Sequence, residues 1–414
     1  MNTEELTKKY VLGNYGRFPI AFERGEGGHI WDENGKCYLD FACGIAVCSL
    51  GHCPEVLRKA LVDQGGKLIH CSNLYHIREQ ALLAEFLVEK VIGRAGKVFF
   101  CNSGAEANEG LIKLARKCAW DRFGGEAKKN RIITIDGSFH GRTLGGIAAT
   151  GQEKVKMGFD PLLPGFSHVP LNDCESLEQA VDESTAGILF EPIQGEGGIH
   201  LVTPEFFRVA AQLREKYDLL LLFDEIQCGI GRTGDWCGWR TVLRDGGVEV
   251  EPDAVSWAKG LGGGFPVGAF WVADEFQAHL GPGTHGSTFG GSPLGSVVSL
   301  AVLNEIERSG ALENVRRQEQ RIRNTVASWK SPLIRSLRGR GLMLGFELDE
   351  SHSYFRNQDS APSLTLVREL MEAGLLTVPA GQQVLRWLPR LNVTDEEVDE
   401  ALNIFQKTIQ RAAA

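Results

Sequence analysis

From about Pro54 onward, apolar segments of strand length alternate with amphipathic segments of helix length, and this alternation limits the fold more than any other feature. Helices are predicted over residues 55–64, 77–91, 106–120 and 204–216, and strands over residues 97–101, 131–135, 187–190, 219–223, 254–257 and 269–273. Several of these strands are apolar throughout, as in a sheet that is covered on both faces. We therefore predict an α/β fold with a mostly parallel sheet.

The two ends of the chain have a different pattern. Near the amino end, Asn34-Gly35 lies between two short predicted strands, which is a strong hairpin signal. Beyond about Pro293 a long helical stretch leads to one predicted strand over Gly339–Leu348, and then to a helix, a strand and a helix. We predict a large domain over residues 54–293 and a smaller α+β domain over residues 294–414. Residues 1–53 would contribute to the smaller domain.

Composition and charge argue against several classes of partner. The 414-residue chain is 43% hydrophobic and 23% charged, which are ordinary globular values. Its net charge of -9, without a long basic cluster, argues against nucleic acid or an anionic membrane. No segment approaches the ~18 apolar residues that span a bilayer, so we expect a cytoplasmic protein, or an organellar one if a transit peptide has been removed. The ten cysteines include no Cys-x-x-Cys pair, so we expect reduced thiols and no metal.

Polar groups follow five of the predicted strands. In a doubly wound sheet the ligand lies at the carboxyl ends of the strands, so these segments are candidates for one site. They are Asn102–Asn108, Asp136–Thr143, Glu191–Gly198, Asp224–Gln227 and Lys259 with the glycines that follow it.

Lys259 and Asp224 are the central candidates. A lysine amine can bind the aldehyde of pyridoxal phosphate covalently, and a buried aspartate can keep the pyridine nitrogen protonated, so that the ring accepts the electrons of a carbanion. Each residue also has a simpler interpretation. A lysine before glycines is often a solvated cation, and an acid after an apolar run often starts a helix.

The other strand ends offer similar alternatives. Ser103 with Glu106 could form an ordinary helix cap, or the helix start could bind a phosphate through its free amides. Phe139 could stack on a planar ring or lie in the core, and Arg142 could bind a carboxylate or lie on the surface. A dinucleotide-binding oxidoreductase would need Gly-x-Gly-x-x-Gly between a strand and a helix, and Gly262-Gly-Gly264 does not open an amphipathic helix.

With these residues in view, the chain resembles the class III, fold type I pyridoxal-phosphate aminotransferases, and among them most closely the acetylornithine aminotransferases. The resemblance runs from about Tyr15 to the last helix and implies a seven-stranded type of sheet in the large domain. The motifs that carry it are Arg17–Ile20, Tyr38–Val47, Asn102–Asn108, Phe139–Thr143, Glu191–Gly198, Asp224–Gln227 with Gly231–Gly234, Ala258–Gly264 and Gly286–Gly291.

The resemblance assigns cofactor roles to matching positions. It implies that the phosphate binds the backbone at Ser103, Gly104 and Ala105. The ring would lie between Phe139 and Ile226. Asp224 would pair with the pyridine nitrogen and Gln227 would approach the phenolic oxygen. Lys259 would bind the cofactor and later act as the base that moves the proton. Thr288 would reach the phosphate of the neighbouring subunit, which implies an obligate homodimer.

The resemblance also implies two substrates that share one pocket. Arg142 with Ser287 would hold the α-carboxylate of N-acetylornithine, and Arg386 would hold that of glutamate or 2-oxoglutarate. Glu196 would mask Arg386 while the first substrate is bound and then swing away. Ile45 stands where ornithine aminotransferases have a tyrosine, which favours an acylated donor. Ornithine, succinylornithine, N-acyl-diaminopimelate and 4-aminobutyrate stay open as donors, as do a mutase or decarboxylase activity and a binding protein without cofactor.

Several positions depart from the family pattern. The segment Gly51-His52-Cys53-Pro54 is one residue short, which could reshape the start of the next helix. Ser292 stands where asparagine is usual, and Arg390 could place a second cation near Arg386. The bulky stretch Trp236–Arg244 could alter the rim of the pocket.

Overall fold

The computed structural model describes residues 1–125 and 128–413, and within them seven strands form a central sheet. The order across this sheet is β4-β12-β11-β10-β7-β5-β6, where β12 is antiparallel to both of its neighbours and the other neighbouring strands run parallel. This confirms the predicted α/β fold with a mostly parallel sheet. The strands are β4 (Gly96–Cys101), β5 (Arg131–Ile135), β6 (Phe166–Val169), β7 (Thr185–Phe190), β10 (Leu220–Asp224), β11 (Ala254–Trp257) and β12 (Gly268–Ala273).

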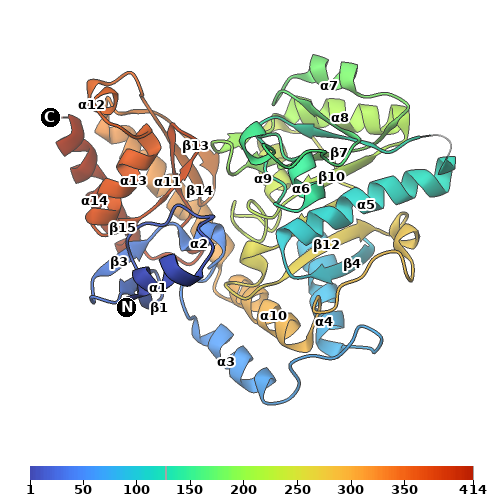
Figure 1. Cartoon of the computed structure of the whole chain (residues 1–414), viewed down its shortest axis with the longest axis horizontal. Helices are drawn as coiled ribbons and strands as arrows, with labels where there is room; N and C mark the ends of the chain where they lie inside the picture. Colours follow the sequence, from blue (N-terminus) through green and yellow to red (C-terminus); the bar gives the residue numbers. More distant parts are fainter. Residues whose placement is uncertain (126–127, 414) are drawn as a thin grey trace.

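Helices cover both faces of this sheet (Figure 1). On one face α5 (Gly104–Phe123) packs Leu111 and Ala115 against strand residues such as Leu222 and Phe270. The other face lies under helices that include α8 (Pro204–Tyr217), and its core holds Phe190, Phe207 and Phe223. The other helical elements in this part of the chain are α3 (Glu55–Gly65), α4 (Arg78–Phe86), the π-helical turn η1 (Leu87–Ile92), α6 (Leu144–Ala149), α7 (Cys174–Ala180), α9 (Gly238–Gly246) and α10 (Pro293–Arg308).

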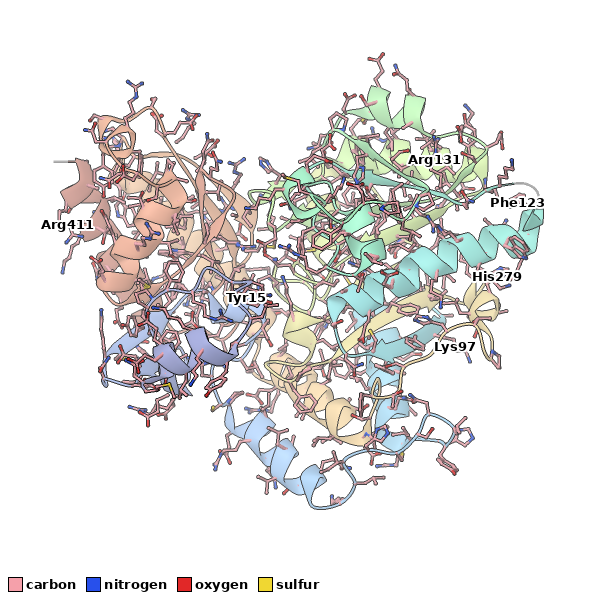
Figure 2. All side chains as sticks on the ribbon, in the orientation of Figure 1. Tyr15, Lys97, Phe123, Arg131, His279 and Arg411 are labelled. Carbon is pink, nitrogen blue, oxygen red and sulfur yellow. The ribbon has the colours of Figure 1, made fainter. Side chains whose placement is uncertain are left out.

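The carboxyl ends of the parallel strands face the middle of the molecule. Lys97 and Arg131, near the starts of β4 and β5, lie toward its right-hand side in Figure 2. The strands therefore run inward, toward the part of the chain formed by the two termini. Ligands bind at this edge in sheets of this kind.

Segments from both ends of the chain lie together on the other side (Figure 1). The amino-terminal strands pair as β1-β2-β3, and β3 pairs in parallel with β15 from the carboxyl-terminal region. A second sheet has the order β13-β14-β17-β16. This pairing agrees with the expected contribution of residues 1–53 to a smaller domain, while the domain boundaries stay a prediction. The bounds are α1 (Thr3–Tyr10), β1 (Phe22–Glu26), β2 (His29–Asp32), β3 (Cys37–Asp40), α2 (Cys43–Ala46), α11 (Ala311–Trp329), β13 (Ile334–Arg340), β14 (Met343–Leu348), α12 (Ser353–Arg356), α13 (Pro362–Glu372), β15 (Leu375–Leu376), β16 (Val378–Ala380), β17 (Val384–Trp387) and α14 (Asp395–Ala413).

The structure confirms the hairpin at Asn34-Gly35 and corrects the strand predicted over Gly339–Leu348. Strands β2 and β3 are antiparallel, and Gly35 has a φ of 80° in the turn between them. The segment 339–348 contains a second hairpin, because the chain reverses at Gly341, where φ is 56°. Strand β6 was not predicted, and η1 interrupts the helix predicted over residues 77–91.

The departures from the family pattern have structural explanations. Helix α3 begins at Glu55 as predicted, although Cys53 has a φ of 48°. Ser292 caps α10, since its Oγ accepts the Gly295 N–H at 3.3 Å. Arg390, which could have placed a second cation near Arg386, forms a two-bond pair with Glu397, at 3.1 and 2.9 Å.

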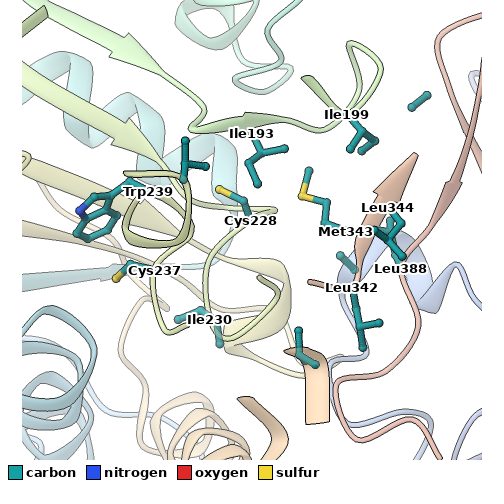
Figure 3. Close-up of a cluster of buried hydrophobic side chains, with 14 of the residues drawn as sticks. Ile193, Ile199, Cys228, Ile230, Cys237, Trp239, Leu342, Met343, Leu344 and Leu388 are labelled. Carbon is teal, nitrogen blue, oxygen red and sulfur yellow. The ribbon is translucent and has the colours of Figure 1, made fainter. Parts of the chain in front are cut away.

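The stretch Trp236–Arg244 does not form the pocket rim that we expected. The Trp239 side chain is fully buried, and α9 is capped by the buried Glu225, whose two oxygens accept the Gly238 and Trp239 N–H groups at 2.7 and 2.8 Å. Bulky residues here serve the packing of α9 against the sheet. Cys228 is likewise buried among apolar side chains that include Ile193 and Met343 (Figure 3).

The described residues contain neither a membrane-spanning helix nor a metal-binding cluster. In residues 1–125 and 128–413, no helix has the length and apolar character needed to cross a membrane. The same ranges contain no group of three or more histidine, cysteine, aspartate or glutamate side chains arranged to hold a metal ion. The ten cysteines are free thiols.

Candidate active site

A cavity of about 430 Å³ lies where the loops after β4, β5, β7, β10 and β11 meet. Most of the predicted site residues line it: Ser103, Gly104, Ala105, Phe139, Arg142, Glu196, Asp224, Ile226, Gln227 and Lys259. The segments predicted from the strand ends therefore come together at one place. The fold brings them there because parallel strands deliver their following loops to a common edge.

The start of α5 forms one wall of the cavity. Ser103 is its N-cap and accepts the Glu106 N–H at 3.3 Å, as the predicted helix cap requires. The first N–H groups of a helix have no partner within it, so Gly104 and Ala105 present free donors at the positive end of the helix dipole. A methyl group on Gly104 would lie 2.7 Å from Ile226 Cδ1, so any larger residue there would displace the Ile226 side chain. The wall suits a phosphate group.

Asp224 lies in a buried polar network at the end of β10. Its Oδ2 accepts a hydrogen bond from Asn108 Nδ2 at 2.7 Å and lies 2.8 Å from His140 Nδ1. Its Oδ1 accepts the Ile226 N–H at 3.0 Å, and Ser256 Oγ donates to Asn108 Oδ1 at 2.7 Å. All of these partners orient the carboxylate, so it is fixed before any ligand binds.

Lys259 follows β11 in a strained turn. Its φ of 42° is in the left-handed region, which is unusual for a residue with a side chain and is common at functional sites. Burial lowers the pKa of its amine below the usual value, although Glu196 acts in the opposite direction. A lowered pKa makes the neutral, nucleophilic amine more abundant near neutral pH.

Phe139 and Ile226 line the cavity from different loops. Arg142 lies near the Phe139 ring, with Cζ 5.3 Å from the ring centroid, and its side chain is exposed. The surface and ligand interpretations of Arg142 are thus both compatible with its position. Phe139 is half-buried and belongs to the cavity wall rather than to the hydrophobic core.

Glu196, which lines the cavity, pairs with Arg386, which lies buried behind the lining residues. Arg386 Nη1 donates to Glu196 Oε1 at 2.8 Å and to Gln227 Oε1 at 2.7 Å, and Nη2 donates to Pro379 O at 3.2 Å. The arginine is 1% exposed, whereas the glutamate side chain is 30% exposed. Burial alone would raise the pKa of Glu196, but Arg386 outweighs it and holds the pKa below its usual value. The carboxylate is therefore charged at neutral pH.

Ser287 and Thr288 do not line the cavity. Ser287 Oγ accepts a hydrogen bond from Asn102 Nδ2 at 3.3 Å, and Asn102 itself lines the cavity. Thr288 is exposed on the loop between β12 and α10. Their predicted roles thus stay predictions that one subunit alone does not test.

Sequence reasoning missed several buried residues of the site. Glu191 was noted only as part of a glycine-rich loop, yet its oxygens accept the Phe139 and Gly195 N–H groups at 2.9 and 3.0 Å. Burial, together with the charge of Asp224, raises the pKa of Glu191 to about 7. Asn108 and His140 were inside quoted motifs without a role. Asn108 follows Ala107 and His140 follows Phe139, in segments that come after predicted strands. This position was the signal that could have indicated them as site residues.

The donor set of the cavity fits pyridoxal phosphate. A helix start supplies free amides for the phosphate, an aromatic ring and an aliphatic side chain can lie on either side of a planar ring, and a fixed carboxylate and a lysine of lowered pKa share the same space. Among residues 1–125 and 128–413, the buried Nε2 of His140, a residue that lines the cavity, has no hydrogen-bond partner.

Comparisons with known proteins agree with this fit. The family model described as "Aminotransferase class-III" matches residues 10–409. The acetylornithine aminotransferase of Caldanaerobacter subterraneus subsp. tengcongensis is 48% identical over 97% of this chain and 98% of its own length.

Two solved structures extend the match to three dimensions. The N-acetylornithine aminotransferase of Stenotrophomonas maltophilia has a TM-score of 0.81 at 36% identity, with 98% of each chain covered. An ornithine aminotransferase of Toxoplasma gondii, with PLP at partial occupancy in its active site, has a TM-score of 0.90 at 30% identity, and the match covers 99% of this chain and 94% of that one. The resemblance seen in the sequence is confirmed: the chain belongs to the class III aminotransferases, which depend on pyridoxal phosphate.

Proposed function

We propose that this aminotransferase moves the terminal amine of N-acetylornithine to 2-oxoglutarate, giving N-acetylglutamate 5-semialdehyde and glutamate. The relative that is 48% identical over nearly its whole length is named for acetylornithine. The reaction is a step in arginine biosynthesis, and we place it in the cytoplasm.

The ion pair between Glu196 and Arg386 is the observation that best supports this proposal. The first donor presents a side-chain amine to the cofactor, whereas glutamate presents the α-amine next to its carboxylate. A buried guanidinium without a partner is costly, so a carboxylate that covers Arg386 stabilises the pocket in the first half-reaction. The 30% exposure of Glu196 leaves it room to swing away in the second.

The residues that line the cavity support the proposed cofactor roles. Gly104 and Ala105 hold the phosphate with their N–H groups, Phe139 and Ile226 pack on the ring, and Asp224 pairs with its nitrogen. Gln227 lies near the phenolic oxygen. When bound, the cofactor supplies an electron sink for the carbanion formed at the substrate. Lys259 would hold the cofactor through its amine and, when that amine is free, would move the proton to and from the substrate carbon.

The first substrate would be held from the other side of the cavity. Arg142, at the rim, and Ser287, beside Asn102, bind the α-carboxylate of N-acetylornithine. Ile45 precedes the cavity residue Val47 and has a φ of 65°, which is rare for a β-branched side chain. An apolar side chain there tolerates an acylated amine and gives no partner to a free one. We therefore expect N-acetylornithine to be preferred over ornithine.

A homodimer with shared sites is part of the proposal. Leu74, Tyr75 and Phe289 are large apolar side chains that are 65–88% exposed. They flank Thr288, because Asn73 donates to the carbonyl oxygens of Ser287 and Gly290 at 3.1 and 3.0 Å. A cluster of this kind favours a protein interface. Sedimentation should give twice the 45.4-kDa chain mass, and an active monomer would contradict the shared site.

The free-ornithine alternative is supported by the structural match to an ornithine aminotransferase. One experiment separates the donors. The cofactor-loaded protein is mixed with N-acetylornithine, ornithine, succinylornithine or 4-aminobutyrate without an acceptor, and the absorbance of the lysine-bound cofactor is followed. We expect a fast loss with N-acetylornithine that 2-oxoglutarate reverses. Equal rates with ornithine would contradict the expected preference for N-acetylornithine. No change in absorbance with any of the amines would contradict the proposed function.

A further inference from the structure

Arg232 is a buried cation on the loop that follows Asp224, Ile226 and Gln227. It is 2% exposed, and its Nη1 donates to the carbonyl oxygens of Leu342, at 3.2 Å, and Pro389. Its own backbone oxygen accepts the Leu342 N–H at 3.0 Å. The residue does not line the cavity, so the cofactor and substrate roles described above do not use it.

The neutral partners of Arg232 make its charge unusual. Among residues 1–125 and 128–413, no carboxylate forms an ion pair with it. Burial lowers the pKa of its guanidinium to about 10, which still leaves it charged at neutral pH. Buried charges are normally paired, because moving an ion out of water is costly. A side chain retained at this cost calls for a role beyond filling space.

The two carbonyl partners of Arg232 lie beside β17, the strand that carries Arg386, and beside its neighbour β14. Leu342 directly precedes β14, and in the pairing of β14 with β17 Gly345 is opposite Arg386. Pro389 follows β17, in which Arg386 is the third residue. A single guanidinium thus ties the start of one strand to the end of its neighbour, at the same end of the pair and a short way beyond the arginine that faces Glu196.

Close packing makes this contact rigid. A methyl group on Gly341 would lie 2.5 Å from Thr233 Cα, so the two backbones are in direct contact. Ile230 belongs to the same apolar cluster as Leu342 and Leu388, and Figure 3 shows these three side chains in it. The loop that carries Arg232 is therefore held against the start of β14, and Arg232 can act as a spacer between the two.

We propose that Arg232 is a positioning residue that sets the separation between the cofactor end of the cavity and Arg386. Glutamate and 2-oxoglutarate must reach both the cofactor and Arg386, whereas the carboxylate of the first donor is held by Arg142 and Ser287, on segments that form no hydrogen bond with Arg232. Arg232 therefore serves one half-reaction and not the other. This inference rests on the proposed function, since it uses the proposed role of Arg386.

The test compares Arg232→Met and Arg232→Lys with the wild-type holoenzyme in both half-reactions, and measures 2-oxoglutarate binding to the aminated form. We expect the KM for 2-oxoglutarate and for glutamate to rise roughly tenfold in Arg232→Met, as for a small misplacement of a substrate-binding group, with little change for N-acetylornithine. Arg232→Lys keeps the charge and one donor group, so it should recover part of the loss.

Arg323→Met is the matched control. Arg323 also donates to two strand carbonyls, those of Leu337 and Gly339 at 2.9 and 2.6 Å, but on β13 rather than beside β17. It should lower the thermal midpoint without the selective rise in KM. Equal losses in both half-reactions for the Arg232 variants, or the same selective rise in Arg323→Met, would overturn the proposal. If Arg232→Met does not fold, Arg232→Lys decides.

Failure of the proposed function gives a different result. It would appear in the wild-type protein as no reaction with N-acetylornithine. In that case the comparison is made between glutamate and whichever side-chain amine the wild-type enzyme accepts. A selective effect on glutamate would still support the role of Arg232, and an equal effect on both would contradict it.

Discussion

At one end of the cavity Asp224 is held by Asn108, His140 and the backbone of Ile226, whereas at the other end Glu196 reaches Arg386 from a different part of the fold. The first end is built from loops of one sheet, and its acid is 3% exposed. The second joins the loop after β7 to a strand of another sheet, and its acid is 30% exposed. The cofactor end is thus preorganised for one chemistry, while the carboxylate end has a partner that can move.

The comparison predicts that changes at the fixed end abolish the chemistry for every substrate. Lys259→Ala should remove the covalent link to the cofactor and lower turnover by at least roughly 10⁴-fold, since both a nucleophile and a base are lost. Borohydride reduction followed by mass measurement checks the link. Lys216→Ala, on the exposed face of α8, is the control and should behave as wild type. Retained turnover in Lys259→Ala would refute the mechanism.

Asp224→Asn should slow both half-reactions by about 10²–10³-fold, the size expected for one preorganised electrostatic group. Asp253→Asn is the matched control. Asp253 is also a buried acid and accepts the Leu221 N–H at 2.7 Å, but it lies away from the cavity. The control should lose stability and keep its half-reaction rates. Single-turnover absorbance measures the rates, and a loss confined to one substrate would break the distinction between the two ends.

Arg386→Met should impair only the second half-reaction. Truncating one partner of a buried charge pair costs about 2–5 kcal/mol, which corresponds to a rise of roughly 30-fold or more in the KM for 2-oxoglutarate. The rate with N-acetylornithine should change little, because its carboxylate is held elsewhere. Steady-state kinetics with each substrate varied in turn provides the check. A parallel loss with N-acetylornithine would place both carboxylates at the same arginine.

The smallest effect is expected outside the cavity, at His52. His52 Nε2 lies 2.8 Å from Asp40 Oδ2, and the hydrogen bonds to Asp40 and to Cys48 raise the pKa of His52 to about 10. The raised pKa means that the pair stabilises the fold fully below pH ~6.5, and that this stability declines as the pH rises toward about 10.

His52→Gln should therefore lower the free energy of unfolding by about 1.5–3 kcal/mol near neutral pH, the range for a hydrogen bond to a charged group. The difference from wild type should shrink as the pH rises, while the half-reaction rates stay unchanged. Urea unfolding at several pH values measures it. A difference that grows with pH would contradict the assigned charge of His52.

The sequence predicted the fixed end of the cavity better than the movable one. Strands Arg131–Ile135 and Ala254–Trp257 were located to the residue, because turn residues follow continuous apolar runs. Their ends place Phe139 and Lys259 at one edge of the sheet by topology alone. The hairpin at Gly341 was missed because the apolar pattern continues on both sides of it.

Side-chain partners that depend on long-range packing could not be predicted in the same way. Asn108 lies on a helix whose pattern explains it equally well as a core residue, and its bonds to Asp224 and His140 appear only in the fold. As an arginine, Arg390 could have been a second residue that binds the substrate carboxylate. Only the position of α14 shows that it binds Glu397 instead. The family resemblance, rather than spacing, indicated Glu196 and Arg386 as partners.

The central claim is that one cavity serves two substrates because Glu196 can release Arg386. Glu196→Gln tests it most directly, through the ratio of kcat/KM for glutamate to that for N-acetylornithine in separate half-reactions. An amide masks Arg386 less strongly than a carboxylate, so glutamate should bind more easily and the ratio should rise by roughly tenfold, about 1.4 kcal/mol. An unchanged ratio, or equal losses with both substrates, would contradict the account.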